Sequence, residues 1–169
     1  FTKNKTQMTL FENLCLEKTI LNAWNHVKAK NAAGGIDGIS ISTFEADLGN
    51  NISEIIEELR SGSWSPRPYM KLEISKKTRE QRKLGLLSIK DKIIQQAIKS
   101  LIEPRMEKLF ASNSYGYRPG KGALKAIRRA LQERTNKNTP WILRLDIDNY
   151  FDNIDHEILQ QRIKAIIPD

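Results

Sequence analysis

The sequence predicts an α+β fold. Apolar residues at three-to-four spacing recur along much of the 169 residues and predict several amphipathic helices. Alternating apolar and polar residues around a polar tip over 69–88 predict one β-hairpin, and an apolar run over 141–147 predicts a buried strand. Helices, hairpin, helices and strand follow one another in blocks, which is the order of an α+β arrangement rather than a regularly alternating one.

The composition is that of a basic globular chain. Hydrophobic residues make up 39% and charged residues 28%, with a formal net charge of +8. The single cysteine, Cys15, excludes an internal disulfide framework and a Cys-rich zinc module, and we expect it to be a buried small hydrophobic residue. No apolar run approaches the ~20 residues of a membrane span, and the first residues contain no signal-peptide core. We therefore expect a soluble, cytoplasmic protein with no membrane partner.

The positive charge is concentrated in the middle of the chain. Residues 67–92 carry a net +6 and residues 93–140 a net +7, whereas 1–66 and 141–169 carry −2 and −3. A basic surface attracts nucleic acid, because binding releases the counterions condensed on the phosphates. A solvated face that keeps the protein soluble explains the same charge equally well. Charge alone leaves both interpretations open.

The first third of the chain predicts helices separated by glycine and proline signals. Residues 9–30 predict one or two amphipathic helices, and the glycine cluster over 32–38 predicts a turn. A helix capped by Ser42 or Thr43 should follow, and the prolines within 61–68 should end it.

The rest of the chain predicts the hairpin, more helices and the strand. Pro104 should interrupt or bend the first of these helices. The expected elements are a hairpin over 69–88, a helix over 89–110, an irregular loop over 113–122, a basic helix over 123–134, a buried strand over 141–147, a tight turn, and a helix from about residue 156.

The candidate chemistry lies at the end of the predicted strand. Asp146 stands between two apolar residues, and burial of a carboxylate is costly unless it is paired or bound to metal. Four carboxylates fall close together beside the basic region, as divalent cations bridging nucleotide phosphates require: Asp146, Asp148, Asp152 and Asp155. We favour helix capping for Asp152 and Asp155, leave Asp148 open to a solvent-facing role, and favour the metal role for Asp146.

The segment LRLDIDNYFDNIDH, residues 143–156, resembles the first catalytic motif of reverse transcriptases, in the form found in group II intron-encoded maturases and their bacterial relatives. Residues 34–68, 69–98 and 101–131 resemble three further blocks of that family in the same order. Residues 9–30 resemble a leading block that intron-type enzymes have and retroviral ones lack. The resemblance covers nearly the whole chain.

The resemblance implies the fingers and partial palm of a right-hand polymerase fold. It divides the chain into an N-terminal helical extension over 1–35, fingers over 36–140 with the basic hairpin at about 69–88, and the start of the palm over 141–169. The family's second catalytic motif, an aromatic–x–Asp–Asp hairpin, follows the first at a distance greater than the sequence left after it here. We therefore expect an N-terminal fragment of a longer enzyme, inactive alone.

The resemblance also implies roles for individual residues. Asp146 is the catalytic, metal-binding carboxylate, and the backbone carbonyl of Ile147 is a second contact to one of two Mg²⁺ ions. The residues implied to bind the deoxynucleoside triphosphate are Lys76, Arg82, Asn149, Tyr150 and Phe151, with Phe151 as the gate that excludes a sugar 2′-hydroxyl. The residues implied to bind RNA are Arg79, Lys83, Tyr115, Arg118 and Lys121.

Several of these roles have structural alternatives. Phe151 also fits as a core aromatic at a strand-to-helix joint, and the loop over 113–122 as a packed turn with Tyr117 in the core and Arg118 ion-paired. The hairpin tip lacks the proline and glycine common in intron-type fingers. The assignment of Lys76 to the triphosphate is therefore less firm than that of Arg82.

The function implied is RNA-directed DNA synthesis on an RNA template and primer. A maturase module that binds intron RNA and assists splicing, and a defence-related or CRISPR-associated relative, are the alternatives. Asp148 stands where intron enzymes frequently carry lysine, which leaves intron membership open. We also expect self-association through the fingers or through an exposed apolar palm surface.

Overall fold

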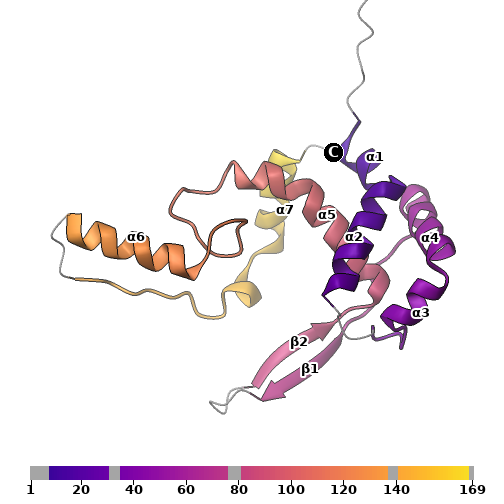
Figure 1. The fold of residues 1–169 in the computed structure, drawn as a ribbon, viewed down its shortest axis with the longest axis horizontal. Coiled ribbons are helices and arrows are strands. Elements are labelled where there is room, and N and C mark those ends of the chain that lie inside the picture. The colour runs from indigo at the N-terminus through magenta and orange to yellow at the C-terminus, as the bar shows by residue number, and fades with distance from the viewer. Residues whose placement is uncertain (1–7, 31–34, 76–80, 137–140, 168–169) are drawn as a thin grey trace, which may run out of the picture. The chain divides into compact units, whose positions relative to one another are not determined.

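The computed structural model describes residues 8–30, 35–75, 81–136 and 141–167. They form two units, residues 1–104 and 105–169, while the three-part division implied by the resemblance remains a prediction. The elements are α1 (Leu10–Leu14), α2 (Glu17–Ala29), α3 (Ile41–Ala46), α4 (Leu48–Ser61), β1 (Met70–Ser75), β2 (Gln81–Leu86), α5 (Ile89–Glu107), α6 (Ala123–Asn136), the 3₁₀-helix η1 (Tyr150–Asn153) and α7 (His156–Ile166) (Figure 1). The described chain is mostly helical, with one two-stranded sheet. None of these helices combines the length and apolar character needed to cross a bilayer.

The first helices begin at polar caps. Thr9 starts α1 with a capping box, in which its hydroxyl accepts from the Glu12 N–H at 3.0 Å and its own N–H donates to the Glu12 carboxylate at 2.8 Å. Ser40 caps α3 and accepts from the Thr43 N–H at 3.0 Å. The predicted cap at Ser42 or Thr43 was therefore wrong. Ser40 has the extended backbone that an N-cap needs, whereas the two later residues already lie inside the helix.

The core of residues 1–104 lies among α2, α4 and α5. Trp24 and Phe44 meet in it with ring centroids 5.0 Å apart. Cys15 is buried as predicted, and burial raises the pKa of its thiol against the opposing effect of Arg60. The largest apolar side chains that are fully buried are Ile20, Trp24, Ile55, Ile89, Ile93 and Ile94. Each contributes about 1.5–3 kcal/mol by leaving water, so this core is the main source of stability of the unit.

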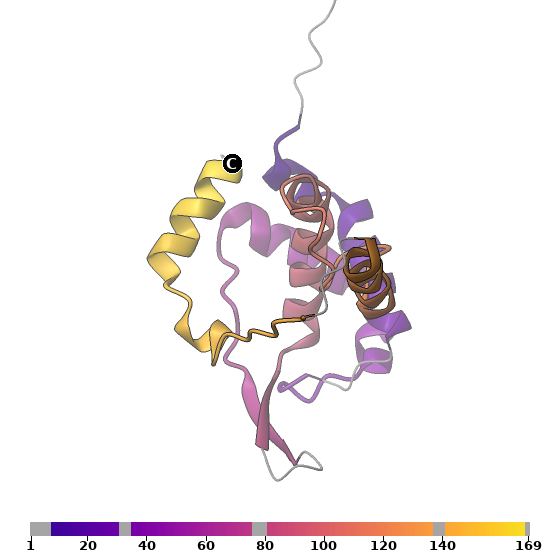
Figure 2. The same ribbon diagram turned by 90° about the vertical axis from the view of Figure 1, so that its left-hand side faces the viewer.

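The hairpin is present where the sequence predicted it. Strands β1 and β2 pair antiparallel, with Met70 opposite Leu86 at the base and Ser75 opposite Gln81 toward the tip. In both views the two strands extend away from α2 and α5 (Figure 1, Figure 2).

A buried carboxylate fixes the base of the hairpin. Asp91, in the first turn of α5, is 2% exposed. Its Oδ2 accepts from the Ser88 hydroxyl at 2.7 Å and from the Arg67 N–H at 3.3 Å, and the Ser88 hydroxyl in turn accepts from the Asp91 N–H at 3.0 Å. Arg67 precedes β1 and Ser88 follows β2, so one carboxylate holds both ends of the hairpin to the start of α5.

Residues 105–169 contain α6, η1 and α7 but no strand among their described residues. The helix from residue 156 is confirmed, with Asp155 as its cap. The predicted buried strand over 141–147 was wrong: this segment is neither strand nor buried, and the Trp141 side chain is 90% exposed. A strand needs hydrogen-bonding neighbours, and the described part of this unit supplies none.

The predicted glycine turn has two different physical causes. Gly38 has φ +71°, the left-handed conformation that favours glycine. Gly35 instead lacks room for a side chain, because a Cβ there would lie 2.8 Å from the Ser88 Cα and 3.0 Å from the Ile89 nitrogen. Backbone atoms cannot move aside as a side-chain tip can. Gly35 therefore lets the 35–39 turn lie against the start of α5.

We expect Gly35→Ala to lower the free energy of unfolding by about 1–3 kcal/mol, because the added methyl group overpacks a backbone contact. Gly49→Ala is the matched control, since a Cβ at Gly49 meets nothing within 4 Å. That change in a helix should leave stability equal or raise it by up to about 1 kcal/mol. Chemical denaturation of the three proteins measures both effects. Equal stability of the two variants would contradict the close approach.

An ion-pair cluster joins α5 to α4. Lys90 donates to carboxylate oxygens of Glu54 and Glu58, each at 2.9 Å. Burial alone would lower the pKa of Lys90, but its hydrogen bonds to Glu58 and Glu54 outweigh burial and raise the pKa overall. The hydrogen bond from Lys90 lowers the pKa of Glu54.

We expect Lys90→Gln to lower the free energy of unfolding by about 1 kcal/mol at neutral pH, a modest value because solvent screens the half-exposed Glu54. Because the pKa of Glu54 is lowered, its carboxylate stabilises the fold above pH 4.5, and this stabilisation is lost as the pH falls through the folded-state pKa. Because the pKa of Lys90 is raised, its ammonium stabilises the fold below pH 10.5, and this stabilisation is lost as the pH rises through the folded-state pKa. The difference from wild type should therefore shrink in acid. Denaturation at neutral and acid pH tests this, with exposed Lys18→Gln as the control; a difference independent of pH would refute it.

Candidate metal and nucleotide site

The candidate site is a turn that leads from an extended segment into α7. Asn149 adopts the left-handed conformation, with φ 46° and ψ 40°, and its carbonyl accepts from the Asp152 and Asn153 N–H groups at 3.1 Å. Asparagine tolerates this backbone region better than most residues. Asp155 closes the turn, since its Oδ1 accepts from the Glu157 N–H at 2.9 Å and the Ile158 N–H at 3.0 Å. The preference for capping at Asp155 is confirmed, whereas no described hydrogen bond gives Asp152 that role.

Asp146 lies in the extended segment just before this turn. Its Oδ1 accepts from the Ile147 N–H at 3.0 Å, and its side chain is exposed. Within the described residues no lysine or arginine forms an ion pair with it, so lone pairs on both oxygens remain for a hard cation.

The donor set suits Mg²⁺ in kind, since the Asp146 carboxylate and the Ile147 carbonyl are both oxygen ligands. It is incomplete in number. Among the described residues no three His, Cys, Asp or Glu side chains come together as a metal cluster. The Asp148 Oδ2 accepts from the side-chain Nδ2 of its neighbour Asn149 at 3.1 Å.

Two aromatic residues follow Asn149 in η1. The Tyr150 and Phe151 rings lie 5.5 Å apart at 58°, and Phe151 is 79% exposed. Phe151 is therefore not a core residue of the described unit.

Arg118 anchors the loop that follows α5. Its Nε donates to both Glu107 carboxylate oxygens, at 3.0 and 3.1 Å, and its Nη2 donates to the same group at 2.6 Å and to the Glu107 carbonyl at 3.5 Å. Its Nη1 donates to the carbonyls of Ala111 at 2.6 Å and Ser114 at 2.9 Å. All five N–H donors of a guanidinium are thereby directed at protein acceptors. The side chain is only 7% exposed, and its hydrogen bond lowers the pKa of Glu107.

The same loop displays Tyr117. Its side chain is fully exposed and its backbone has φ 54°, a rare conformation for a bulky residue. The packed-turn alternative is thus right about the ion pair of Arg118 and wrong about Tyr117 in the core. Tyr115 is half-buried, with the Lys121 ammonium 5.3 Å from its ring centroid, and that ammonium donates to the Ser112 carbonyl at 2.7 Å.

The remaining predicted residues belong to the hairpin of the other unit. Arg82 and Lys83 lie on β2, opposite Ile74 and Glu73 in the register. Lys76 and Arg79 lie outside the described residues.

Residues 74–169 match the family described as "Reverse transcriptase (RNA-dependent DNA polymerase)". The chain belongs to the reverse transcriptase family. The matched region contains the end of β1, all of β2, the Arg118 loop and the Asp146 turn. The resemblance stated from the sequence motifs is confirmed.

Relatives of this reverse transcriptase chain include bacterial proteins and proteins of fungal introns. It is 30% identical to Protein YkfC of Escherichia coli over 80% of this chain, and 33% identical to the Group II intron-encoded protein LtrA of Lactococcus lactis over 82%. It is 29% identical, over 95% of its length, to a 91 kDa protein in the cob intron of Schizosaccharomyces pombe. The chain spans 36%, 23% and 20% of these three proteins.

Sequence reasoning missed the partner of Arg118. Glu107 ends α5 eleven residues earlier, and the pair forms only because the intervening loop folds back. No spacing rule predicts such a contact, and nothing in the sequence distinguishes Glu107 from any other acidic residue on the exposed face of a helix.

We expect Arg118→Lys to speed amide exchange in the loop over 108–122, because an ammonium offers three donors in place of a planar fork of five. Glu107→Gln should act in the same direction. Exchange in the double variant should be no faster than in the faster single variant, since both changes remove one interaction. Exposed Arg105→Lys, in the last turn of α5, is the control. Additive increases in the exchange rate would contradict the anchoring role.

Proposed function

We propose that the protein containing this chain is an RNA-directed DNA polymerase, which extends a primer on an RNA template with deoxynucleoside triphosphates. The proposal is carried by Asp146, an exposed carboxylate that directly precedes a left-handed turn within the region matched to reverse transcriptases. An acid in that place, followed by a polar and aromatic turn, is the arrangement that positions a cation beside a nucleotide.

In this proposal Asp146 and the Ile147 carbonyl hold a divalent cation, and Mg²⁺ is the ion whose oxygen preference they meet. Two such ions, when bound, activate the primer 3′-hydroxyl and neutralise the triphosphate. Because the described residues offer no cluster of three ligating side chains, we infer that residues 1–169 by themselves do not polymerise.

Contacts to the nucleotide are proposed for the turn and, separately, for the hairpin. Asn149 and Tyr150 offer backbone N–H groups, and Phe151 offers an exposed ring that walls off the 2′ side of the sugar. Arg82 on β2 and Lys76 supply cations to the triphosphate through charge-assisted hydrogen bonds. A cationic hairpin that closes over the nucleotide brings these charges in only when substrate arrives.

RNA contact is proposed for the hairpin and for the loop after α5. Arg79 and Lys83 contribute charge, while Tyr115 and Tyr117 offer rings on which bases stack. The fully exposed Tyr117 is the strongest of these candidates. Lys121 lies beside Tyr115 and can reach a phosphate from there. Arg118 is proposed to act by holding this loop in place.

Assistance to intron splicing is a second candidate function. The observation that favours it is the similarity to a protein named as group II intron-encoded, over most of this chain. RNA binding by the leading helices and the fingers would serve splicing as well as synthesis, so the two functions share one surface. A non-intron relative, such as a defence-related or CRISPR-associated enzyme, is the third possibility. It would also synthesise DNA, so cellular experiments rather than a DNA synthesis assay would distinguish it.

We expect the full-length protein to extend a primer on an RNA template with Mg²⁺, and Asp146→Ala to reduce synthesis by more than about a hundredfold, because loss of a metal ligand costs more than loss of an outer-shell partner. Asp148→Asn is the matched control, a nearby charge-removing change at a side chain that bonds only its neighbour. It should remain close to wild type. Synthesis that survives Asp146→Ala would overturn the assignment of the metal site. A wild-type protein that binds RNA but makes no DNA would favour splicing.

A further inference from the structure

A cationic pocket lies between α2 and α5, in the unit formed by residues 1–104. It has a volume of 380 Å³ and no part in the nucleotide site proposed above. The residues that line it are His26, Val27, Lys30, Lys92, Gln95, Gln96 and Lys99. Three are lysines, and among these described lining residues none is a carboxylate.

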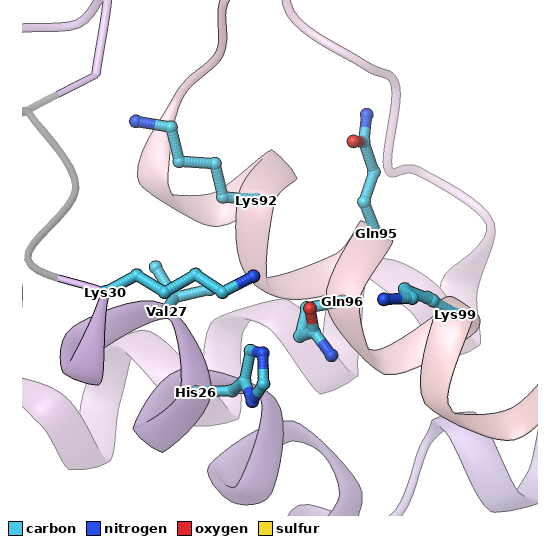
Figure 3. A pocket seen from close by; sticks show the side chains of 7 residues that line it. All are labelled: His26, Val27, Lys30, Lys92, Gln95, Gln96 and Lys99. Atoms are coloured by element: carbon cyan, nitrogen blue, oxygen red, sulfur yellow. The ribbon is translucent and has the colours of Figure 1, made fainter. Parts of the chain in front are cut away.

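Two of the lysines converge. Lys30, at the C-cap of α2, and Lys99, on α5, extend toward each other across the His26 ring and the Gln96 amide, whereas Lys92 and Gln95 turn away (Figure 3). The Gln96 Nε2 donates to the Ser100 hydroxyl at 3.1 Å, which leaves the side-chain amide oxygen of Gln96 as an acceptor at the pocket. The pocket therefore combines two ammonium groups with a ring nitrogen and an amide oxygen.

The charges of this pocket are only partly balanced. Lys99 forms an ion pair with Glu103 at 3.7 Å, in which the two side chains are 57% and 35% exposed. Burial lowers the pKa of Lys92, and Asp37 opposes that effect. Like charges gathered around one hollow oppose folding. An anionic ligand would remove that cost.

We propose that Lys30 and Lys99 bind a backbone phosphate of RNA in this pocket, with the His26 ring and the side-chain amide oxygen of Gln96 placed for the adjoining 2′-hydroxyl. The inference rests on the proposed RNA-directed function. Lysine holds a phosphate as a compact point charge, and an acceptor beside it is what distinguishes a ribose from a deoxyribose.

The pocket favours a polyanion over a free phosphate ion. Both ammoniums stand on flexible stems, the Lys99 side chain is 57% exposed, and the described lining offers no arginine fork to enclose a small anion. Such a site gains affinity when its phosphate is one of many on a strand that other basic residues hold, since each contact then releases counterions from the same polymer.

Lysine footprinting of the full-length protein tests the site directly. An amine-reactive reagent followed by peptide mass spectrometry should show modification of Lys30 and Lys99 falling several-fold when single-stranded RNA is bound, while exposed Lys18 on α2 stays unchanged. Inorganic phosphate at matched phosphate concentration should protect neither. Equal protection by inorganic phosphate would overturn the assignment to RNA.

Salt dependence gives the second measurement. Lys30→Gln with Lys99→Gln should reduce the slope of log affinity against log salt by about 0.7, the loss of one phosphate contact on a single strand. Lys18→Gln with Lys164→Gln removes the same charge from exposed positions outside the pocket and should leave the slope unchanged. RNA bound with Lys30 and Lys99 still fully reactive would overturn the pocket while sparing the proposed function. Failure of the protein to bind RNA at all would overturn both.

Discussion

The Asp91 carboxylate is the interaction on which the arrangement of the first unit depends. It is buried, it lies in the first turn of α5, and it accepts from Arg67, which precedes β1, and from Ser88, which follows β2. A carboxylate in that position is favoured by the helix dipole as well as by its hydrogen bonds. An uncompensated charge would be costly there, so the two donors and the acid need one another. The hairpin thus leaves the helical core from a fixed base, although its two strands alone would be only marginally stable.

The residues that stabilise the first unit differ from the basic residues that are proposed to bind ligand. The core among α2, α4 and α5 is apolar, and the Lys90 cluster on its surface is neutralised by Glu54 and Glu58. The basic residues proposed to meet nucleotide and RNA are placed on the hairpin and on the Arg118 loop, outside that core. The contacts proposed for nucleotide and RNA are thus separate from the packing of this core.

Local rules predicted the elements that depend on local residues. Helical spacing over 9–30 and 123–134 gave the right kind of element, and strand alternation predicted the hairpin, because both periodicities reflect which face is buried. The rules failed where a distant partner decides. The Arg118 pair requires a folded loop, the pocket requires residues from α2 and α5 that are far apart in sequence, and Gly35 is fixed by the backbone of Ser88. For 141–147 the apolar run predicted a buried strand and the prediction was wrong, because an apolar run cannot supply the neighbouring strands that a sheet needs.

The exposed apolar residues around Asp146 set a physical condition for the proposed chemistry. Trp141, Leu143 and Leu145 stand open to solvent beside the acid, and the large apolar residues of α6 and α7 are exposed as well. A sugar gate at Phe151 needs a fixed ring, and a metal site needs ligands held within a fraction of an ångström. Both follow if neighbouring strands cover this segment, because burial would immobilise Phe151 and the hydrogen-bond ladder would fix the Asp146 backbone. The same step would bury the carboxylate itself, which is tolerable only with a cation bound. In the proposed function, completion of such a sheet and binding of a cation would therefore be coupled, because a buried Asp146 carboxylate needs a partner.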